Sequence, residues 1–201
     1  MEASYMTRHP FTKDIIGIVI FIVCVVVGTI LINTFVFRSF NVVGPSMETT
    51  LFTGDRLIVD RLPVTWAQLQ NKAYQPKRGQ IIVFKNPHYS ASMEDEFIVK
   101  RVIGLPGEHV VLKDGHYTVF NSQFPNGFNP DDNNHSEPGT PTSGEADQIV
   151  PTGELFVSGD HRQANYSYDS RNGLGTIPLY DVIGPAELRI FPFDKVRTFP
   201  T

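Results

Sequence analysis

The stretch IIGIVIFIVCVVVGTILINTFVF, residues Ile15–Phe37, is 23 residues long and contains no Asp, Glu, Lys or Arg. As a helix it would be about 35 Å long, which is enough to cross a hydrocarbon layer of about 30 Å. The apolar region of a cleavable signal peptide is shorter, about 7–15 residues, and a cleavage site with small residues follows it. No such site follows Phe37, so the run predicts a transmembrane helix at 15–37 behind a short N-terminal tail at 1–14.

Outside this run the chain is ordinary in polarity and slightly acidic. It has 201 residues, with 17 Lys and Arg against 21 Asp and Glu, which gives a formal net charge of −4. Proteins that bind nucleic acid neutralise phosphates with clustered positive charge, so this balance argues against that class. The single cysteine, Cys24, lies inside the apolar run, which excludes an intrachain disulfide and a zinc site built from cysteines.

The charges that flank the apolar run do not decide its orientation in a membrane. Arg8 and Lys13 precede the run and Arg38 follows it, so neither side has a clear excess of positive charge. The usual arrangement for such a chain has the short tail inside and the large domain outside. We therefore expect a single-pass protein of the plasma (inner) membrane whose domain at 38–201 lies on the extracytoplasmic side.

After the apolar run the sequence consists of short strand-like segments separated by turn residues. Val, Ile and Phe dominate the segments, and Gly, Pro, Asn or Asp separates them. The candidates are Arg56–Leu62, Gln80–Phe84, Phe97–Ile103, His109–Leu112, His116–Phe120, Glu154–Val157 and Val182–Phe191. Trp66–Lys72 is a candidate for one or two helical turns. The pattern predicts one mostly β domain of antiparallel strands at 38–201, with a loop-rich insertion at about 121–148.

The first segment whose residues could take part in a reaction is Gly44-Pro45-Ser46-Met47. The sequence has no His-Glu-x-x-His, Gly-x-Ser-x-Gly or Gly-x-x-x-x-Gly-Lys motif, so zinc peptidases, α/β-hydrolases and P-loop proteins have no support. Ser46 lies nine residues beyond the apolar run, which limits it to within about 30 Å of the membrane surface. On local grounds alone, a serine in such a segment is usually just a turn residue.

The second segment is Phe97-Ile98-Val99-Lys100-Arg101-Val102-Ile103. In a strand, Ile98, Lys100 and Val102 share one face, so Lys100 has apolar neighbours. If that face is buried, desolvation lowers the pKa of the amine, and the neutral amine can accept a proton from a serine hydroxyl. The alternative is a lysine at a strand edge that extends its amine into water.

The third segment holds Gly159-Asp160-His161-Arg162 and then Ser167-Tyr168-Asp169-Ser170-Arg171. It offers hydroxyl groups and an Asp/Arg pair that could brace a site, although a polar turn with a surface ion pair has the same composition. In this order the three segments resemble the bacterial type I signal peptidase family, membrane-bound serine peptidases that remove signal peptides from exported proteins. Lys100–Glu108, which begins in the second segment, matches one motif of that family, and the strand Arg78–Phe84 matches a further one.

The resemblance implies a role for each matching residue. Ser46 would be the nucleophile and Lys100 the general base, a Ser–Lys variant of serine hydrolysis. The expected support of the active site and the oxyanion comes from Gly44, Asp160, Ser167, Asp169 and Arg171. The expected pocket for small substrate residues, of the Ala-x-Ala type, is formed by Met47, Leu51, Ile98 and Val99. The family further implies preprotein substrates, a lipid bilayer, no metal or cofactor, no nucleic acid and a monomeric enzyme.

Several positions depart from the family pattern. Gly44 stands where many members have a serine that donates to the oxyanion, and Thr49 stands in place of a proline. Gln80 and Glu108 each replace an aspartate, and the last segment has four residues between Arg162 and Ser167, where two are common. Two alternatives remain: a membrane-anchored β module that binds peptides without cutting them, and a self-cleaving Ser–Lys regulator. The expected membrane anchor disfavours the second, because such regulators carry a DNA-binding domain, which is missing here.

Overall fold

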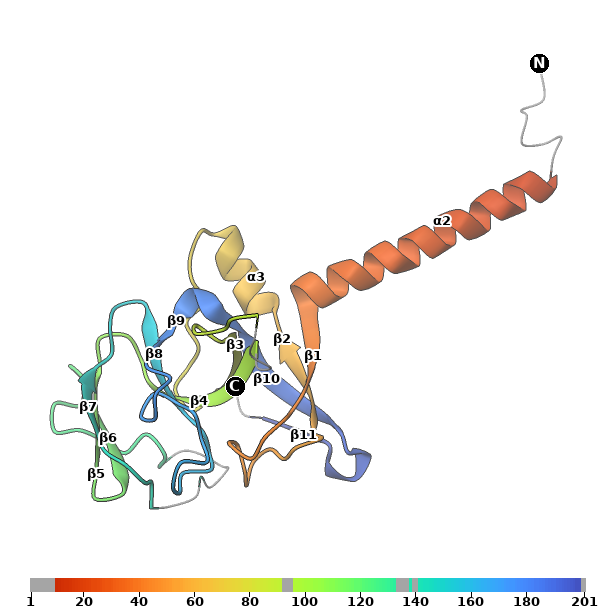
Figure 1. Ribbon diagram of the computed structural model, residues 1–201. Helices are drawn as coiled ribbons and strands as arrows, with labels where there is room; N and C mark the ends of the chain where they lie inside the picture. Colours follow the sequence, from red (N-terminus) through yellow and green to blue (C-terminus); the bar gives the residue numbers. More distant parts are fainter. Residues whose placement is uncertain (1–9, 92–95, 133–137, 139–140, 200–201) are drawn as a thin grey trace.

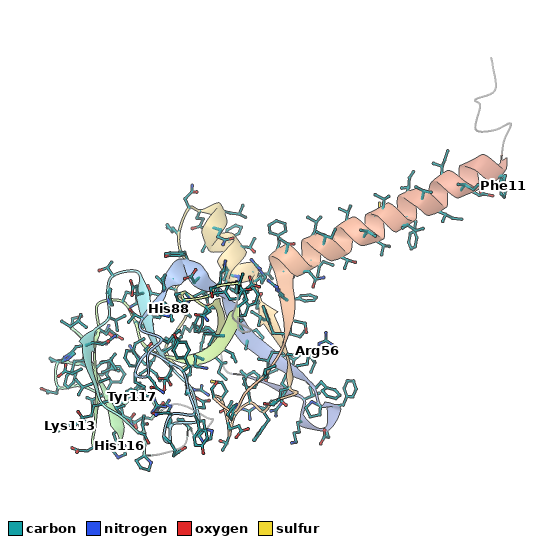
Figure 2. All side chains as sticks on the ribbon, viewed as in Figure 1. Phe11, Arg56, His88, Lys113, His116 and Tyr117 are labelled. Carbon is teal, nitrogen blue, oxygen red and sulfur yellow. The ribbon has the colours of Figure 1, made fainter. Side chains whose placement is uncertain are left out.

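The computed structural model describes residues 10–91, 96–132, 138 and 141–199. It begins with a helix, α2 (Pro10–Leu31), which continues into a π-helical turn, η1 (Ile32–Val36). The segment Lys13–Val36 is long and apolar enough to cross a membrane, by its length and composition. Figure 1 shows α2 standing clear of the other elements, and Figure 2 shows Phe11 at its far end. Its apolar side chains are therefore exposed and find no partner within the described chain.

The rest of the described chain is mostly β. The strands are β1 (Phe37–Asn41), β2 (Arg56–Asp60), β3 (Ile81–Lys85), β4 (Phe97–Gly104), β5 (His109–Lys113), β6 (His116–Phe120), β7 (Ala146–Ile149), β8 (Glu154–Ser158), β9 (Ile177–Pro178), β10 (Val182–Phe191) and β11 (Arg197–Thr198). The short helices are α3 (Leu62–Leu69), η2 (Leu179–Asp181) and η3 (Phe193–Lys195). All seven predicted strands form, with ends within two residues of those predicted.

The strands form two antiparallel sheets. The larger sheet has the order β1-β2-β10-β3-β4-β8-β9, with β11 paired to β10, and the smaller has the order β6-β5-β7. Every strand pair in both sheets is antiparallel, so the predicted mostly β, antiparallel fold is confirmed. The small sheet lies on the side of the molecule away from α2 (Figure 1).

The central strand β3 is buried on both faces. Ile81 and Val83 point into one hydrophobic cluster, and Ile82 and Phe84 point into another. Burial on both faces explains why this strand is a continuous apolar run instead of an alternating one. Because a shift of one residue would exchange the two faces, the packing fixes the register of β3, in which Ile82 pairs with Lys100 of β4.

Two predicted segments differ in detail from the structure. The helical turn predicted at Trp66–Lys72 begins four residues earlier, at Leu62, because Pro63 occupies the first turn of α3, a position where proline favours helix initiation. Within the expected insertion at 121–148, the described residues are turns and irregular chain up to Ala146, where β7 starts. An isolated bridge between Val119 and Phe128 ties the start of this segment to β6.

Candidate active site

Ser46 lies in a tight turn between β1 and β2. The N–H groups of Thr50 and Leu51 both donate to the carbonyl oxygen of Met47, each over 2.9 Å. Met47 and Leu51 are fully buried in the cluster that β2 and β3 share. The turn is thereby fixed to the core, and Ser46 stays partly exposed beside a groove.

Lys100 approaches the same point from β4. Its Nζ lies 2.7 Å from Oγ of Ser46 and donates to the carbonyl oxygen of Val99 over 2.9 Å. The residue is only 3% exposed, so the amine is largely removed from water. A hydroxyl and an amine that are 54 residues apart in sequence are thus in hydrogen-bond contact.

A groove of about 520 Å³ opens beside the Ser46–Lys100 pair. It is lined by the segments 40–46 and 96–100, and Tyr166 and Tyr168 add aromatic rings. The segment that carries the two tyrosines includes the stretch between Arg162 and Ser167, which has four residues and so exceeds the usual spacing by two. The extra residues therefore lie next to the groove.

The four expected pocket residues divide into two pairs. Ile98 and Val99 line the groove. Met47 and Leu51 do not line it; both are fully buried in the core beneath the turn. The cause is the tight turn after Ser46, which directs their side chains inward instead of along the groove.

Gly159 is the point where the third segment meets the nucleophile turn. The N–H of His161 donates to the carbonyl oxygen of Ser46 over 3.1 Å. A Cβ atom on Gly159 would lie 2.2 Å from that same oxygen and 2.2 Å from Oγ of Ser167. Ser167 is fully buried, and its hydroxyl has no hydrogen-bond partner in the described part of the chain. Only a glycine at position 159 allows the two segments to approach this closely.

The Gly159→Ala variant should therefore be less stable. A contact of 2.2 Å with a backbone oxygen forces the backbone to move, and such overpacking typically costs about 1–3 kcal/mol of unfolding free energy. Urea denaturation of the full chain in detergent, followed by circular dichroism, measures the change. Gly28→Ala is the matched control, since a Cβ there meets nothing within 4 Å. Equal midpoints for the two variants would contradict this account of the contact.

A buried ion pair connects the lysine strand to the third segment. Arg101, the neighbour of Lys100, donates from Nε and Nη2 to the two carboxylate oxygens of Asp160, at 2.7 and 2.5 Å. The hydroxyl of Thr50, from the nucleophile turn, donates to the same carboxylate over 2.5 Å. Asp160 is fully buried and Arg101 almost so. One carboxylate thus links the three segments that meet at Ser46.

Asp169 and Arg171 form a second buried pair. Nε of Arg171 lies 3.2 Å from the Asp169 carboxylate, and the N–H of Gly159 donates to that carboxylate over 2.9 Å. Arg171 also donates to the carbonyl oxygens of Ser143 and Arg162, at 2.6 and 2.7 Å. The pair therefore braces the loop that contacts the nucleophile turn.

The insertion contributes a contact that the sequence analysis missed. Arg162 is fully buried, and its guanidinium donates to both oxygens of Asp131 over 3.1 Å. Burial lowers the pKa of Arg162, but the charges of Asp131, Tyr117 and Asp160 and the hydrogen bond to Asp131 together raise it by more, so the pKa of Arg162 is raised. The guanidinium also lies 5.0 Å from the ring of Tyr117, whose pKa burial raises to about 12. Asp131 lies in a loop of polar composition, where a charged residue is common, so the sequence gives no signal that it pairs with a buried arginine.

The glycine at position 44, where many members of the family have a serine, has a structural reason. Gly44 adopts a φ of +87°, a conformation that residues with a side chain rarely adopt. Its N–H donates to Oγ1 of Thr53 over 3.1 Å. The glycine thus permits the sharp bend by which the chain enters the Ser46 turn.

The chemistry available at the site is that of a hydroxyl and an amine. Within the described ranges, no three His, Cys, Asp or Glu side chains gather as a metal site. His161 directs Nδ1 toward the carbonyl oxygen of Pro45, at 3.1 Å, and its ring stacks on Tyr166. These contacts of His161 are with Pro45 and Tyr166. The side chain in hydrogen-bond contact with the Ser46 hydroxyl is that of Lys100.

Comparison with known proteins shows the family of the chain. The family model for signal peptidase, peptidase S26, matches residues 13–191. Signal peptidase I of Bacillus licheniformis is 35% identical over 182 residues, which is 88% of each chain. Signal peptidase I T of Bacillus subtilis (strain 168) is 33% identical and covers 88% of this chain and 85% of its own.

A solved structure adds a further comparison. The crystal structure of a signal peptidase I from Enterococcus faecalis V583 is 26% identical, covers 57% of this chain and 98% of its own, and has a TM-score of 0.40. The family model matches most of the chain, and the Bacillus relatives are 33–35% identical to it over most of their length. The chain belongs to the signal peptidase family of serine endopeptidases, peptidase S26.

Proposed function

We propose that the chain removes signal peptides from exported preproteins, with Ser46 as the nucleophile and Lys100 as the general base. The observation that carries this proposal is the 2.7 Å separation of Ser46 Oγ and Lys100 Nζ. Burial of Lys100 disfavours its charged form, which leaves an amine able to accept the serine proton. The names of the relatives, signal peptidase I, suggest the class of substrate.

The reaction would proceed through an acyl-enzyme. Lys100 takes the proton of Ser46 as Oγ attacks the scissile carbonyl carbon, and the resulting ammonium returns a proton to the departing amine of the mature protein. The signal peptide is then held as an ester on Ser46. A water molecule gives a proton to Lys100 as it attacks that ester, and the proton returns to Ser46 when the ester bond breaks.

The other expected residues would support this reaction. The N–H of Ser46 would donate to the oxyanion, with Gly44 shaping the approach of the chain. The buried hydroxyl of Ser167 lies near the carbonyl oxygen of Ser46 and makes no hydrogen bond within the described residues, so to orient the Lys100 amine it would have to turn toward Nζ. Asp160, together with the Asp169–Arg171 pair, would hold the three segments in register.

The groove supports binding of an extended peptide. The preprotein would lie between 40–46 and 96–100, adding to the strand edges and placing alternate side chains toward the walls. Ile98 and Val99 give one wall an apolar surface. Small residues at the first and third positions before the cut, as in Ala-x-Ala, would fit beside them.

Membrane anchoring would bring enzyme and substrate together. With α2 across the plasma membrane and the β domain on its outer side, the active site shares a surface with the apolar segment of the signal peptide. Confinement to one surface raises the effective concentration of the two reactants.

Cleavage of a defined preprotein tests this proposal. The full chain in detergent should cut a purified preprotein after Ala-x-Ala, and sequencing of the product identifies the bond. Replacing the alanine before the cut with phenylalanine should lower kcat/KM at least about tenfold, because a large side chain does not fit a pocket for small ones. The same replacement several residues after the cut is the control. Binding of the preprotein without any cleavage would overturn the proposal in favour of a peptide-binding module.

A further inference from the structure

The short helix α3 exposes an apolar face that nothing in the described chain covers. Leu62, Trp66 and Leu69 are 53%, 66% and 73% exposed. Their spacing of four and three residues places them on one side of the helix. Val64 is the buried residue of the helix and attaches it to the domain. Three large apolar side chains thus face outward together in a helix of only eight residues.

This helix is attached to the end of the apolar segment. Oγ1 of Thr65 donates to the carbonyl oxygen of Phe35 over 2.9 Å, and the N–H of Arg61 donates to that of Val36 over 2.8 Å. Phe35 and Val36 are the last residues of η1, with which the long apolar helix ends. Figure 1 shows α3 beside this end of α2. If α2 spans a bilayer, α3 is therefore held at the level where the chain leaves the hydrocarbon.

Two arginines, Arg38 and Arg61, lie at the same end of the apolar segment, next to Asp60, whose Oδ1 accepts from the N–H of Leu62 over 2.8 Å. Arg61 precedes α3, and Nε of its guanidinium is buried without a hydrogen-bond partner in the described ranges. Burial and the charge of Arg38 together lower the pKa of Arg61, which means that the two cations lie close to each other. Phosphate groups of lipid headgroups would complement this charge.

We propose that α3 is an interfacial helix that inserts Leu62, Trp66 and Leu69 into the boundary between headgroups and acyl chains of the bilayer that α2 spans. Tryptophan favours this layer because its ring is apolar and its N–H is polar. A helix that lies in the membrane plane beside a spanning helix gives the domain a second attachment. Two attachments fix the tilt of the β domain relative to the membrane, and thereby the height of the groove above the membrane surface. Attachment through α2 alone would leave this tilt free to vary. This inference rests on the proposed spanning of the membrane by α2.

The single tryptophan of the chain makes this helix directly observable. The full chain is reconstituted in vesicles of phosphatidylethanolamine and phosphatidylglycerol, with bromine on the acyl chains either near the headgroup or near the chain end. Bromine near the headgroup should lower Trp66 fluorescence about twofold, bromine near the chain end should have a smaller effect, and aqueous iodide should quench weakly. Leu62→Ser combined with Leu69→Ser should reverse this pattern, with more quenching by iodide and less by bromine.

Two relocated reporters separate this inference from the anchor itself. In a Trp66→Phe background, Phe21→Trp reports on α2, and Phe124→Trp reports on an exposed site in the loop after β6, a strand of the smaller sheet. The α2 reporter should be quenched by brominated lipid and the loop reporter should not. One outcome would overturn the inference and leave the anchor intact: iodide quenches Trp66 and brominated lipid does not, while brominated lipid quenches the α2 reporter. An unquenched α2 reporter would overturn both.

Discussion

The Lys100→Met variant should lose about 10³-fold or more in kcat for preprotein cleavage while binding the substrate as before. Methionine has nearly the length and shape of lysine, so the packing around β4 is preserved and only the amine is lost. Without a base in contact with Ser46, the hydroxyl must attack as a poor nucleophile. Ser46→Ala should have a comparable effect, and the double variant should be little worse than either single one, because the two residues act as a unit.

Two further measurements distinguish a base from a positive charge. Lys100→Arg keeps a cation that does not lose its proton, so it should be as inactive as Lys100→Met. In the wild type the rate should rise with pH, because only the neutral amine accepts the serine proton. Lys85→Met, at an exposed position on the adjacent strand β3, is the matched control and should keep the wild-type rate. Retention of more than about a tenth of the activity in Lys100→Met would contradict the dyad.

The β domain could be predicted from local signals, but the assembly of the site could not. Val- and Ile-rich segments between turn residues give strands, and the seven predicted ones all form. The alternation in β4 shows that Lys100 shares a face with apolar residues, but not which other segment that face meets. Its contact with Ser46 depends on the register of β3 against β4 and on the turn at 44–50. The sequence indicated this pairing only through the resemblance to a family.

Side-chain directions within irregular segments were the least predictable feature. Met47 and Leu51 were expected in the pocket, but the turn that presents Ser46 directs them into the core. Asp131 lies in a polar loop, and nothing local indicates that its carboxylate meets the buried Arg162. Such contacts depend on how distant loops fold over one another.

The Asp160→Asn variant should lose about 3–5 kcal/mol of unfolding free energy, the largest stability change that we expect for a single substitution here. The amide has the shape of the carboxylate but no charge, so Arg101 remains a buried cation without its counter-ion. The hydroxyl of Thr50 would lose its charged acceptor as well. Urea denaturation of the full chain in detergent measures the effect. Asp147→Asn is the matched control, because Asp147 pairs with His109 at an exposed site and should change stability by less than about 0.5 kcal/mol.

The same pair shows whether Asp160 serves stability or position. Replacing both partners, with Arg101→Met and Asp160→Leu, removes the unpaired charge and should recover most of the lost stability. Catalytic activity should not recover, because the apolar pair cannot accept the Thr50 hydroxyl that ties the nucleophile turn to the lysine strand. Stability and activity would then separate in one double variant. If the double variant regained the wild-type cleavage rate together with its stability, the Asp160 carboxylate would have no part in positioning Ser46 against Lys100.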